Sequence, residues 1–203
     1  MKYFMGIDPS INSTGVCIID ENNNTEFFII KPNKLKKEEQ KALDNILNLN
    51  YILYDKIDLN EYKDNNHLSE YYKTINILNI VKSIKDIIHQ KTIFDNELYI
   101  LMEGISYGSS MKTKSIYDLA GLNFLIRNVC ISNNQSIHLI IAPPSEIKKF
   151  ASGNGNCQKD VINNLFMCIF PEFNAYKIKI DDISDAFFMS QARKTIYEKE
   201  SQT

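Results

Sequence analysis

The sequence predicts an α/β domain with a mixed β-sheet, in which three antiparallel strands are followed by parallel strands and flanked by α-helices. Two observations support this prediction. Three short runs rich in β-branched and aromatic residues open the chain with only turn-like segments between them, which is typical of an antiparallel meander. After them, helical and strand-like patterns alternate, which is typical of an α/β domain.

The three opening strands are expected at residues 2–8, 15–20 and 26–30. Pro9 opens the first connection and a segment rich in Asn at 21–24 forms the second, and both compositions are typical of turns. Such short connections predict that neighbouring strands run in opposite directions.

Residues 31–66 have a different texture, rich in Lys and Asn, and we interpret them as an insertion within a single domain of residues 1–203. Some strand character appears at 51–59. Three lysines of this segment either add contacts to DNA phosphates or form a solvated face, which is the commoner role of such a charge run. They are Lys34, Lys36 and Lys37.

Helices and strands alternate from residue 68 onward. An amphipathic helix is expected at 68–90, because apolar residues recur there at spacings of three and four. The run at 98–103 is short and apolar and ends on a charge, which is typical of a buried central strand. The remaining expected elements are a helix at 113–130, a strand at 137–142, and helices at 145–150, 158–170 and 182–192.

The composition argues against several classes of protein. The four cysteines lack the spacing of zinc ligands or of a disulfide framework, so we expect a reducing compartment. No run approaches about 18 uninterrupted apolar residues and no signal-peptide pattern is seen, so we expect a cytoplasmic protein without a membrane partner. The net charge of −2 is compatible with nucleic-acid binding, which needs only a local basic face.

Two acidic residues stand at the ends of predicted core strands. Asp8 ends the first strand directly before Pro9, and Glu103 ends the apolar run directly before Gly104. Burying a carboxylate is costly unless it is paired or binds a cation. One acid at a strand end is ordinary, but two on separate central strands indicate a cation site.

A third acidic element begins the last predicted helix. Asp182 and Asp185 are three residues apart and therefore project from one helix face. Taken alone, the run is more simply explained as a helix N-terminus whose acids cap it and complement its dipole. Asp181, four residues before Asp185, competes with Asp182 for the same role.

Four carboxylates without His or Cys partners suit hard cations such as Mg²⁺ or Mn²⁺. Two such ions about 3.5–4 Å apart can activate water and stabilise the leaving 3′ oxygen of a phosphodiester. The residues therefore predict a phosphodiester hydrolase with two Mg²⁺ ions per active site, for which Mn²⁺ substitutes.

Four segments, taken together, resemble the RuvC family of Holliday-junction resolvases, which have an RNase H-like fold. They occur in the family's order and span most of the chain except 31–66. Each is a weak signal alone, but the ordered set is specific. The segments are GIDPSINSTGVCII with Asp8, LMEGISYGSS with Glu103, PPSEIKKFASGNGNCQKDVI with Lys148 and Lys159, and DDISDAFFMS with Asp182 and Asp185.

The resemblance also implies roles for individual residues. Lys159 opens a helix after a Gly-containing loop, so it is the better candidate for stabilising charge in the transition state. The glycines of that loop, beside Lys149, either let the backbone approach a DNA phosphate or simply form a turn. By the resemblance, the metal ligands are Asp8, Glu103, Asp182 and Asp185, and the DNA-binding residues are Tyr107, Lys148, Lys149, Gly153, Gly155 and Lys159.

The sequence departs from the family after the second acid. Family resolvases place an aromatic residue three positions after this acid, where it wedges into the junction. Here that position is Ser106, and the aromatic residue Tyr107 follows it. Tyr107 either stacks on a base or packs on the protein.

The resemblance implies a homodimer that cuts four-way DNA junctions by paired symmetric nicks, with dimerisation through the helix after the second acid. Two-fold protein symmetry would place one active site on each of two opposing strands. Related nucleases of flaps, forks or hybrids would keep the same acids. An ATPase of the actin and sugar-kinase type would need a second copy of the fold, for which 203 residues leave no room. A relative that has lost its metals would not retain all four acids.

Overall fold

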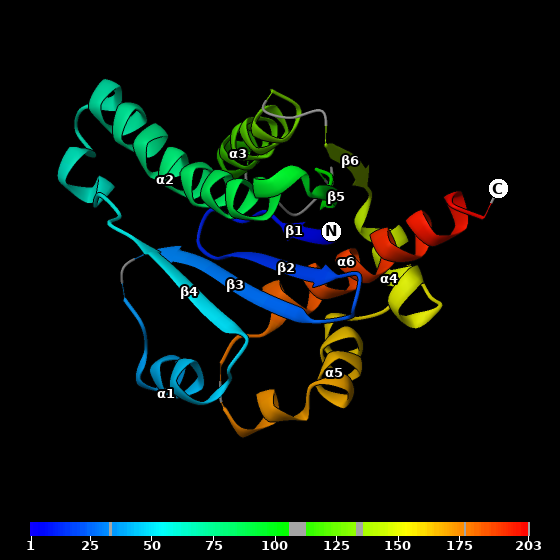
Figure 1. The fold of residues 1–203 in the computed structure, drawn as a ribbon. Helices are drawn as coiled ribbons and strands as arrows, with labels where there is room; N and C mark the ends of the chain where they lie inside the picture. The colour runs from blue at the N-terminus through cyan, green and yellow to red at the C-terminus, as the bar shows by residue number, and fades with distance from the viewer. Residues whose placement is uncertain (33, 106–112, 133–135, 177, 203) are drawn as a thin grey trace.

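The computed structural model describes residues 1–32, 34–105, 113–132, 136–176 and 178–202. In this part of the chain the strands form one mixed sheet in the order β4-β3-β2-β1-β5-β6 (Figure 1). The strands are β1 (Lys2–Asp8), β2 (Thr14–Asp20), β3 (Thr25–Pro32), β4 (Leu49–Tyr54), β5 (Glu97–Glu103) and β6 (Ile137–Ala142). The α-helices are α1 (Lys37–Asn45), α2 (Asn66–Thr92), α3 (Thr113–Ser132), α4 (Pro144–Ser152), α5 (Lys159–Ile169) and α6 (Asp181–Glu200).

The strand directions confirm the predicted mixed sheet. β1 and β2 pair antiparallel, as do β2 and β3, because hairpins join them. β5 pairs parallel with β1 and with β6, because helices lie between them in the chain and return it to the same end of the sheet. The same ends of β1 and β5 therefore lie side by side.

The segment 31–66 contributes to this sheet and is more than a solvated excursion. β4 lies at the sheet edge, parallel to β3, and ends at Tyr54, whereas strand character was expected to extend to residue 59. α1 precedes β4 and buries Ala42 against the core. Within this segment, Lys31 Nζ lies 2.6 Å from Glu39 Oε1, so this lysine forms an ion pair with an acid of the same segment.

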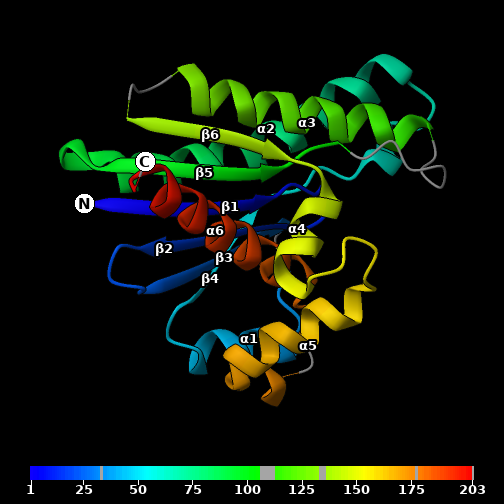
Figure 2. The same cartoon turned by 90° about the vertical axis from the view of Figure 1, so that its right-hand side faces the viewer.

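The helices cover the sheet on both faces (Figure 2). α2 and α3 pack over one face, where Ile84 and Ile126 are fully buried. α6 crosses the other face over β1 and β2 and is joined there by α5. On that face Phe27 of β3 packs edge-on against Phe166 of α5.

α6 runs to Glu200, eight residues beyond its predicted end at residue 192. Its last turns stay packed because Arg193 lies 4.9 Å from the ring centroid of Tyr99, and Tyr197 contacts the same ring at 4.6 Å. No helix in the described ranges is both long and apolar enough to cross a membrane.

Candidate active site

The first two acids lie at adjacent strand ends. In the parallel pairing of β1 and β5, Ile7 is opposite Met102, so Asp8 and Glu103 follow at the same edge of the sheet. Asp8 is buried, and a side-chain hydrogen bond joins it to Glu103. On the far side of Glu103, Asn123 Nδ2 of α3 donates to the Glu103 carbonyl oxygen at 2.9 Å and fixes the end of β5.

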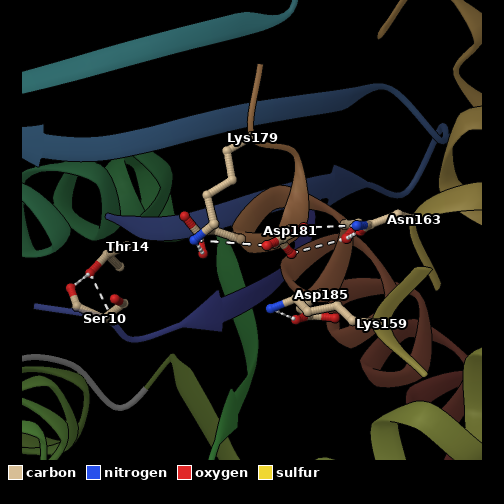
Figure 3. Close-up of polar contacts among 9 residues, drawn as sticks. Ser10, Thr14, Lys159, Asn163, Lys179, Asp181 and Asp185 are labelled. Atoms are coloured by element: carbon tan, nitrogen blue, oxygen red, sulfur yellow. Dashed lines mark hydrogen bonds and ion pairs between the residues drawn. The ribbon is translucent and has the colours of Figure 1, made fainter. Parts of the chain in front are cut away.

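The turn after Asp8 is closed by Thr14. The Thr14 hydroxyl donates to the Ser10 carbonyl oxygen at 2.7 Å, and the Ser10 N–H donates back to Thr14 Oγ1 at 3.2 Å (Figure 3). This small ring brings Gly15 opposite Asp8 in the antiparallel pairing. The hairpin therefore holds Asp8 and Gly15 as cross-strand neighbours.

Two glycines let α6 approach the sheet closely enough to bring its acids to the same edge. A Cβ atom on Gly15 would lie 2.1 Å from the carbonyl oxygen of Asp182, and one on Gly6 would lie 1.9 Å from that of Ala186. No larger residue fits at either position without moving the helix. The contact at Gly15 sets the start of α6, and with it Asp182, against β2 beside Asp8.

The fourth acid, Asp185, lies one turn further along α6 and pairs with a lysine from another helix. Lys159 is the first residue of α5, and its Nζ lies 3.1 Å from Asp185 Oδ2 (Figure 3). Burial opposes the charge on Lys159, but Asp185, Asp8 and Asp181 outweigh it and raise the lysine's pKa. Lys159 therefore stays cationic at the centre of the acidic group.

The four carboxylates affect one another electrostatically. Burial raises the pKa of Asp8 well above its ordinary value, and the charges of Glu103, Asp185 and Asp182 raise it further. Burial also raises the pKa of Glu103 and of Asp185, although Lys159 lowers both in part. Carboxyl groups that resist ionisation together gain most from a cation placed among them.

Asp181 and Asp182 have different surroundings. Asp181 Oδ1 accepts a hydrogen bond of 2.7 Å from Asn163 Nδ2 of α5, and Asn163 Oδ1 accepts one of 2.7 Å from the Ser184 hydroxyl. Asp181 thus ties α5 to α6. Asp182 is buried, and its charge helps to raise the pKa of Asp8, whereas Asp181 and Asp182 both raise that of Asp185. Because Asn163 already holds Asp181, these surroundings favour Asp182 as the acid that would bind a cation.

Solved structures with the same architecture are known. A Thermus thermophilus RuvC structure has a TM-score of 0.51 at 12% identity, and it covers 97% of this chain and 96% of its own. T. thermophilus RuvC in complex with a Holliday junction substrate has a TM-score of 0.56 at 10% identity, with the same 97% and 96% coverage. A crystal structure of the yeast mitochondrial Holliday junction resolvase Ydc2 matches at a TM-score of 0.49 and 14% identity, covering 98% of this chain and 82% of its own.

This chain has the RuvC fold. The resemblance seen in the sequence is confirmed at the level of the fold. No protein-family model and no curated protein sequence matches the chain.

The acids of this RuvC fold suit hard cations, because all four offer oxygen donors and share one edge of the sheet. As their side chains lie, no three His, Cys, Asp or Glu residues in the described ranges are arranged to hold a metal ion. Asp8 instead bonds Glu103, while Lys159 and Lys179 pair with Asp185 and Asp182. The donor chemistry fits Mg²⁺ or Mn²⁺, and binding would require these contacts to give way.

The other predicted DNA-binding residues have different surroundings in the structure. On α4, Lys148 lies close enough to lower the pKa of Glu103, whereas its neighbour Lys149 is exposed. Gly153 caps α4 with a positive φ of 78°, and Gly155 approaches the Ser145 carbonyl oxygen so closely that a Cβ would lie 2.9 Å from it. The left-handed backbone of the helix cap thus accounts for Gly153, and close packing accounts for Gly155. Tyr107 and Ser106 lie outside the described residues.

Several residues of the site were not singled out in the sequence. Gly6 and Gly15 set the position of α6, Asn163 holds Asp181, and Lys179 contacts two acids. The two glycines lie within GIDPSINSTGVCII, but only the packing against α6 reveals their role. The sequence offered one indication that Lys179 belongs to the site, which is its position three residues before Asp182.

The raised pKa values predict how stability depends on pH when divalent ions are chelated. Asp8 and Glu103 ordinarily titrate near 3.8 and 4.5, and both values are raised in the fold. The folded state therefore holds protons that the unfolded state releases, so this contribution is fully present below about pH 4 and is lost as the pH rises through the raised values. The free energy of unfolding, measured by urea titration in EDTA, should fall as the pH rises above about 4, and more steeply than in Asp8→Asn, whose remaining slope serves as the control. Equal slopes would contradict the raised pKa of Asp8.

Proposed function

We propose that this protein is a metal-dependent endonuclease that resolves four-way DNA junctions by paired nicks. The observation that carries the proposal is the gathering of Asp8, Glu103, Asp182 and Asp185 at one edge of a RuvC-type sheet. One solved relative in fold is described as a complex with a Holliday junction substrate, which supports branched DNA as the substrate class.

Each acid has a role in this proposal. Asp8, Glu103, Asp182 and Asp185 would hold two Mg²⁺ ions, for which Mn²⁺ substitutes. When bound, the ions supply an activated water and a counter-charge for the leaving 3′ oxygen. A bound cation would favour the carboxylate form of Asp8 and so offset the burial and the neighbouring charges that raise its pKa.

The lysines around the acids would receive the DNA backbone. Lys159 is held by Asp185 at the centre of the group, so its ammonium is oriented to stabilise negative charge developing on the phosphate. Lys148 lies beside Glu103 on α4, and exposed Lys149 extends the positive charge outward. We expect these three to position the phosphate and not to read sequence.

A homodimer is part of this proposal, and α3 offers a surface for it. Tyr117, Phe124 and Ile131 are 72%, 59% and 72% exposed and lie seven residues apart. Gly121 and Asn128 fall between them, so the five residues form one stripe with the alternating spacing of four and three found in helix–helix seams. An apolar stripe this long on an exposed helix favours a second copy of the chain as its partner.

We predict that Phe124→Glu converts a dimer into a monomer, because a charge at the centre of the stripe would be buried unpaired in the interface. Sedimentation equilibrium at about 10 µM should give twice the chain mass for the wild type and the chain mass for the variant. Phe94→Glu makes the same chemical change at a 92% exposed position outside α3 and should remain dimeric. A monomeric wild type, or a dimeric Phe124→Glu, would contradict dimerisation through this stripe.

The proposed function is tested with end-labelled substrates. The purified protein is incubated with a four-way junction, a linear duplex, a flap and an RNA–DNA hybrid, with Mg²⁺ or with EDTA. Metal-dependent nicks at symmetric positions in two opposing strands of the junction alone would support resolution. Preferred cutting of flaps or hybrids would assign the same site to a related nuclease, and uniform cutting of all four would indicate a nuclease without structural selectivity.

A further inference from the structure

Lys179 lies at the outer side of the acidic group, in the segment just before α6. Its Nζ is 3.4 Å from Asp182 Oδ1 and 3.8 Å from Asp181 Oδ2 (Figure 3). The lysine side chain is 64% exposed, whereas that of Asp182 is only 7% exposed. The side chain of Lys179 is thus largely exposed to solvent, and it contacts a carboxylate that is almost completely buried.

The two acids that Lys179 contacts are not equally free to change partner. Asp181 is also held by Asn163 at 2.7 Å, so it has a structural contact that remains if the lysine leaves. Asp182 lies close enough to Asp8 and Asp185 for its charge to raise the pKa of both, and a divalent cation would bind among these acids. Any such ion on Asp182 would place two positive charges beside the ammonium of Lys179 and repel it.

We propose that Lys179 is a built-in counter-ion that competes with the divalent metal for Asp182. This inference rests on the proposed function, because it takes the four acids as the metal ligands. The ammonium offsets charge at Asp182 and is displaced when metal binds. Displacement is easy, since the lysine is solvated along a flexible stem and an exposed ion pair contributes little to stability. Lys179 therefore raises the metal concentration that the site requires.

Lys159 differs from Lys179 in this respect. It is less exposed, it opens α5, and its pKa is raised by Asp185, Asp8 and Asp181. Lys159 remains beside Asp185 as a member of the site. Lys179 reaches in from a connecting segment and therefore serves a different purpose.

The test measures Mn²⁺ binding to the full-length chain by isothermal titration calorimetry and by the loss of free-Mn²⁺ signal in electron paramagnetic resonance. Lys179→Met should bind Mn²⁺ about two- to fivefold more tightly than the wild type at low ionic strength, the range expected for removing an exposed ion pair. The difference should shrink in about 0.5 M salt, because exposed charges are screened there. Lys179→Arg keeps the charge and should match the wild type.

Lys82→Met is the matched control, because it removes one exposed positive charge on α2, which lies across the sheet from α6 (Figure 2). It should change Mn²⁺ affinity by less than about 1.5-fold, since screening weakens the influence of a distant exposed charge. Equal or weaker affinity in Lys179→Met than in the wild type would overturn the inference and leave the proposed function standing. If neither the wild type nor any variant bound Mn²⁺, the metal-dependent nuclease and the counter-ion would both be wrong.

Discussion

Replacing Asp8 by Asn should abolish junction cleavage and yet stabilise the fold in the absence of divalent ions. The loss should be at least about 10³-fold in rate, because substitution of residues that merely support a metal ligand already costs about 10–100-fold. The gain in stability follows from the raised pKa of Asp8, since the amide has no charge to bury at neutral pH. Single-turnover cleavage at saturating Mg²⁺ and thermal melting in EDTA measure the two effects.

Asp181→Asn is the matched control for this experiment. It also turns a carboxylate into an amide, but Asp181 accepts a hydrogen bond from Asn163 across the α5–α6 contact. Its rate of cleavage should fall by no more than about 10–100-fold, the cost of losing a supporting contact. Equal losses of cleavage rate in Asp8→Asn and Asp181→Asn would show that the total negative charge matters and not the position of Asp8. Full activity in Asp8→Asn would show that the proposed active site is wrong.

Gly6→Ala should destabilise the protein by about 3 kcal/mol or more, the upper part of the range for overpacked cores. The new methyl group would lie 1.9 Å from the carbonyl oxygen of Ala186, a backbone atom that cannot turn aside as a side chain can. α6 would have to lift from β1, and Asp182 and Asp185 would move with it. At roughly 2–4 °C per kcal/mol for a chain of this size, the melting temperature should fall by about 6 °C or more.

Gly121→Ala provides the comparison. A Cβ atom at Gly121, on α3, meets no atom within 4 Å, and alanine is the better helix former. In the monomeric Phe124→Glu background, where the stripe on α3 is uncovered, this variant should gain about 0.5–1 kcal/mol, so the same chemical change has opposite effects at the two positions. A Gly6→Ala protein that melts like the wild type would mean that α6 does not pack as closely as the structure places it.

The sheet was predictable because its strands are short runs of apolar and β-branched residues. The strand at Ile137–Ala142 lies at its predicted bounds, and the mixed strand directions follow from the alternation of short turns and helices. β4 was indistinct because its residues alternate only weakly between buried and exposed, and because it lies in a stretch rich in Lys and Asn, which are depleted in strands.

The candidate site was predictable to the extent that it depends on local order. Acids at the ends of buried strands can be recognised in the sequence, because the apolar character of the residues before them predicts a buried strand. The distinction between Asp181 and Asp182 depends on Asn163 from another helix, and that between Lys148 and Lys149 depends on which side of α4 faces the acids. Contacts between elements far apart in the chain leave no pattern that a single sequence reveals.

The close packing of α6 on β1 and β2 also has a consequence for biosynthesis. The ribosome makes every strand of the sheet before it makes Asp181–Glu200, so the face with Gly6 and Gly15 emerges uncovered. Asp8 and Glu103 are present early, but Asp182 and Asp185 reach them only when this helix docks. A nascent chain thus holds Asp8 and Glu103 before Asp182 and Asp185, and the four acids come together only when α6 has folded onto the sheet.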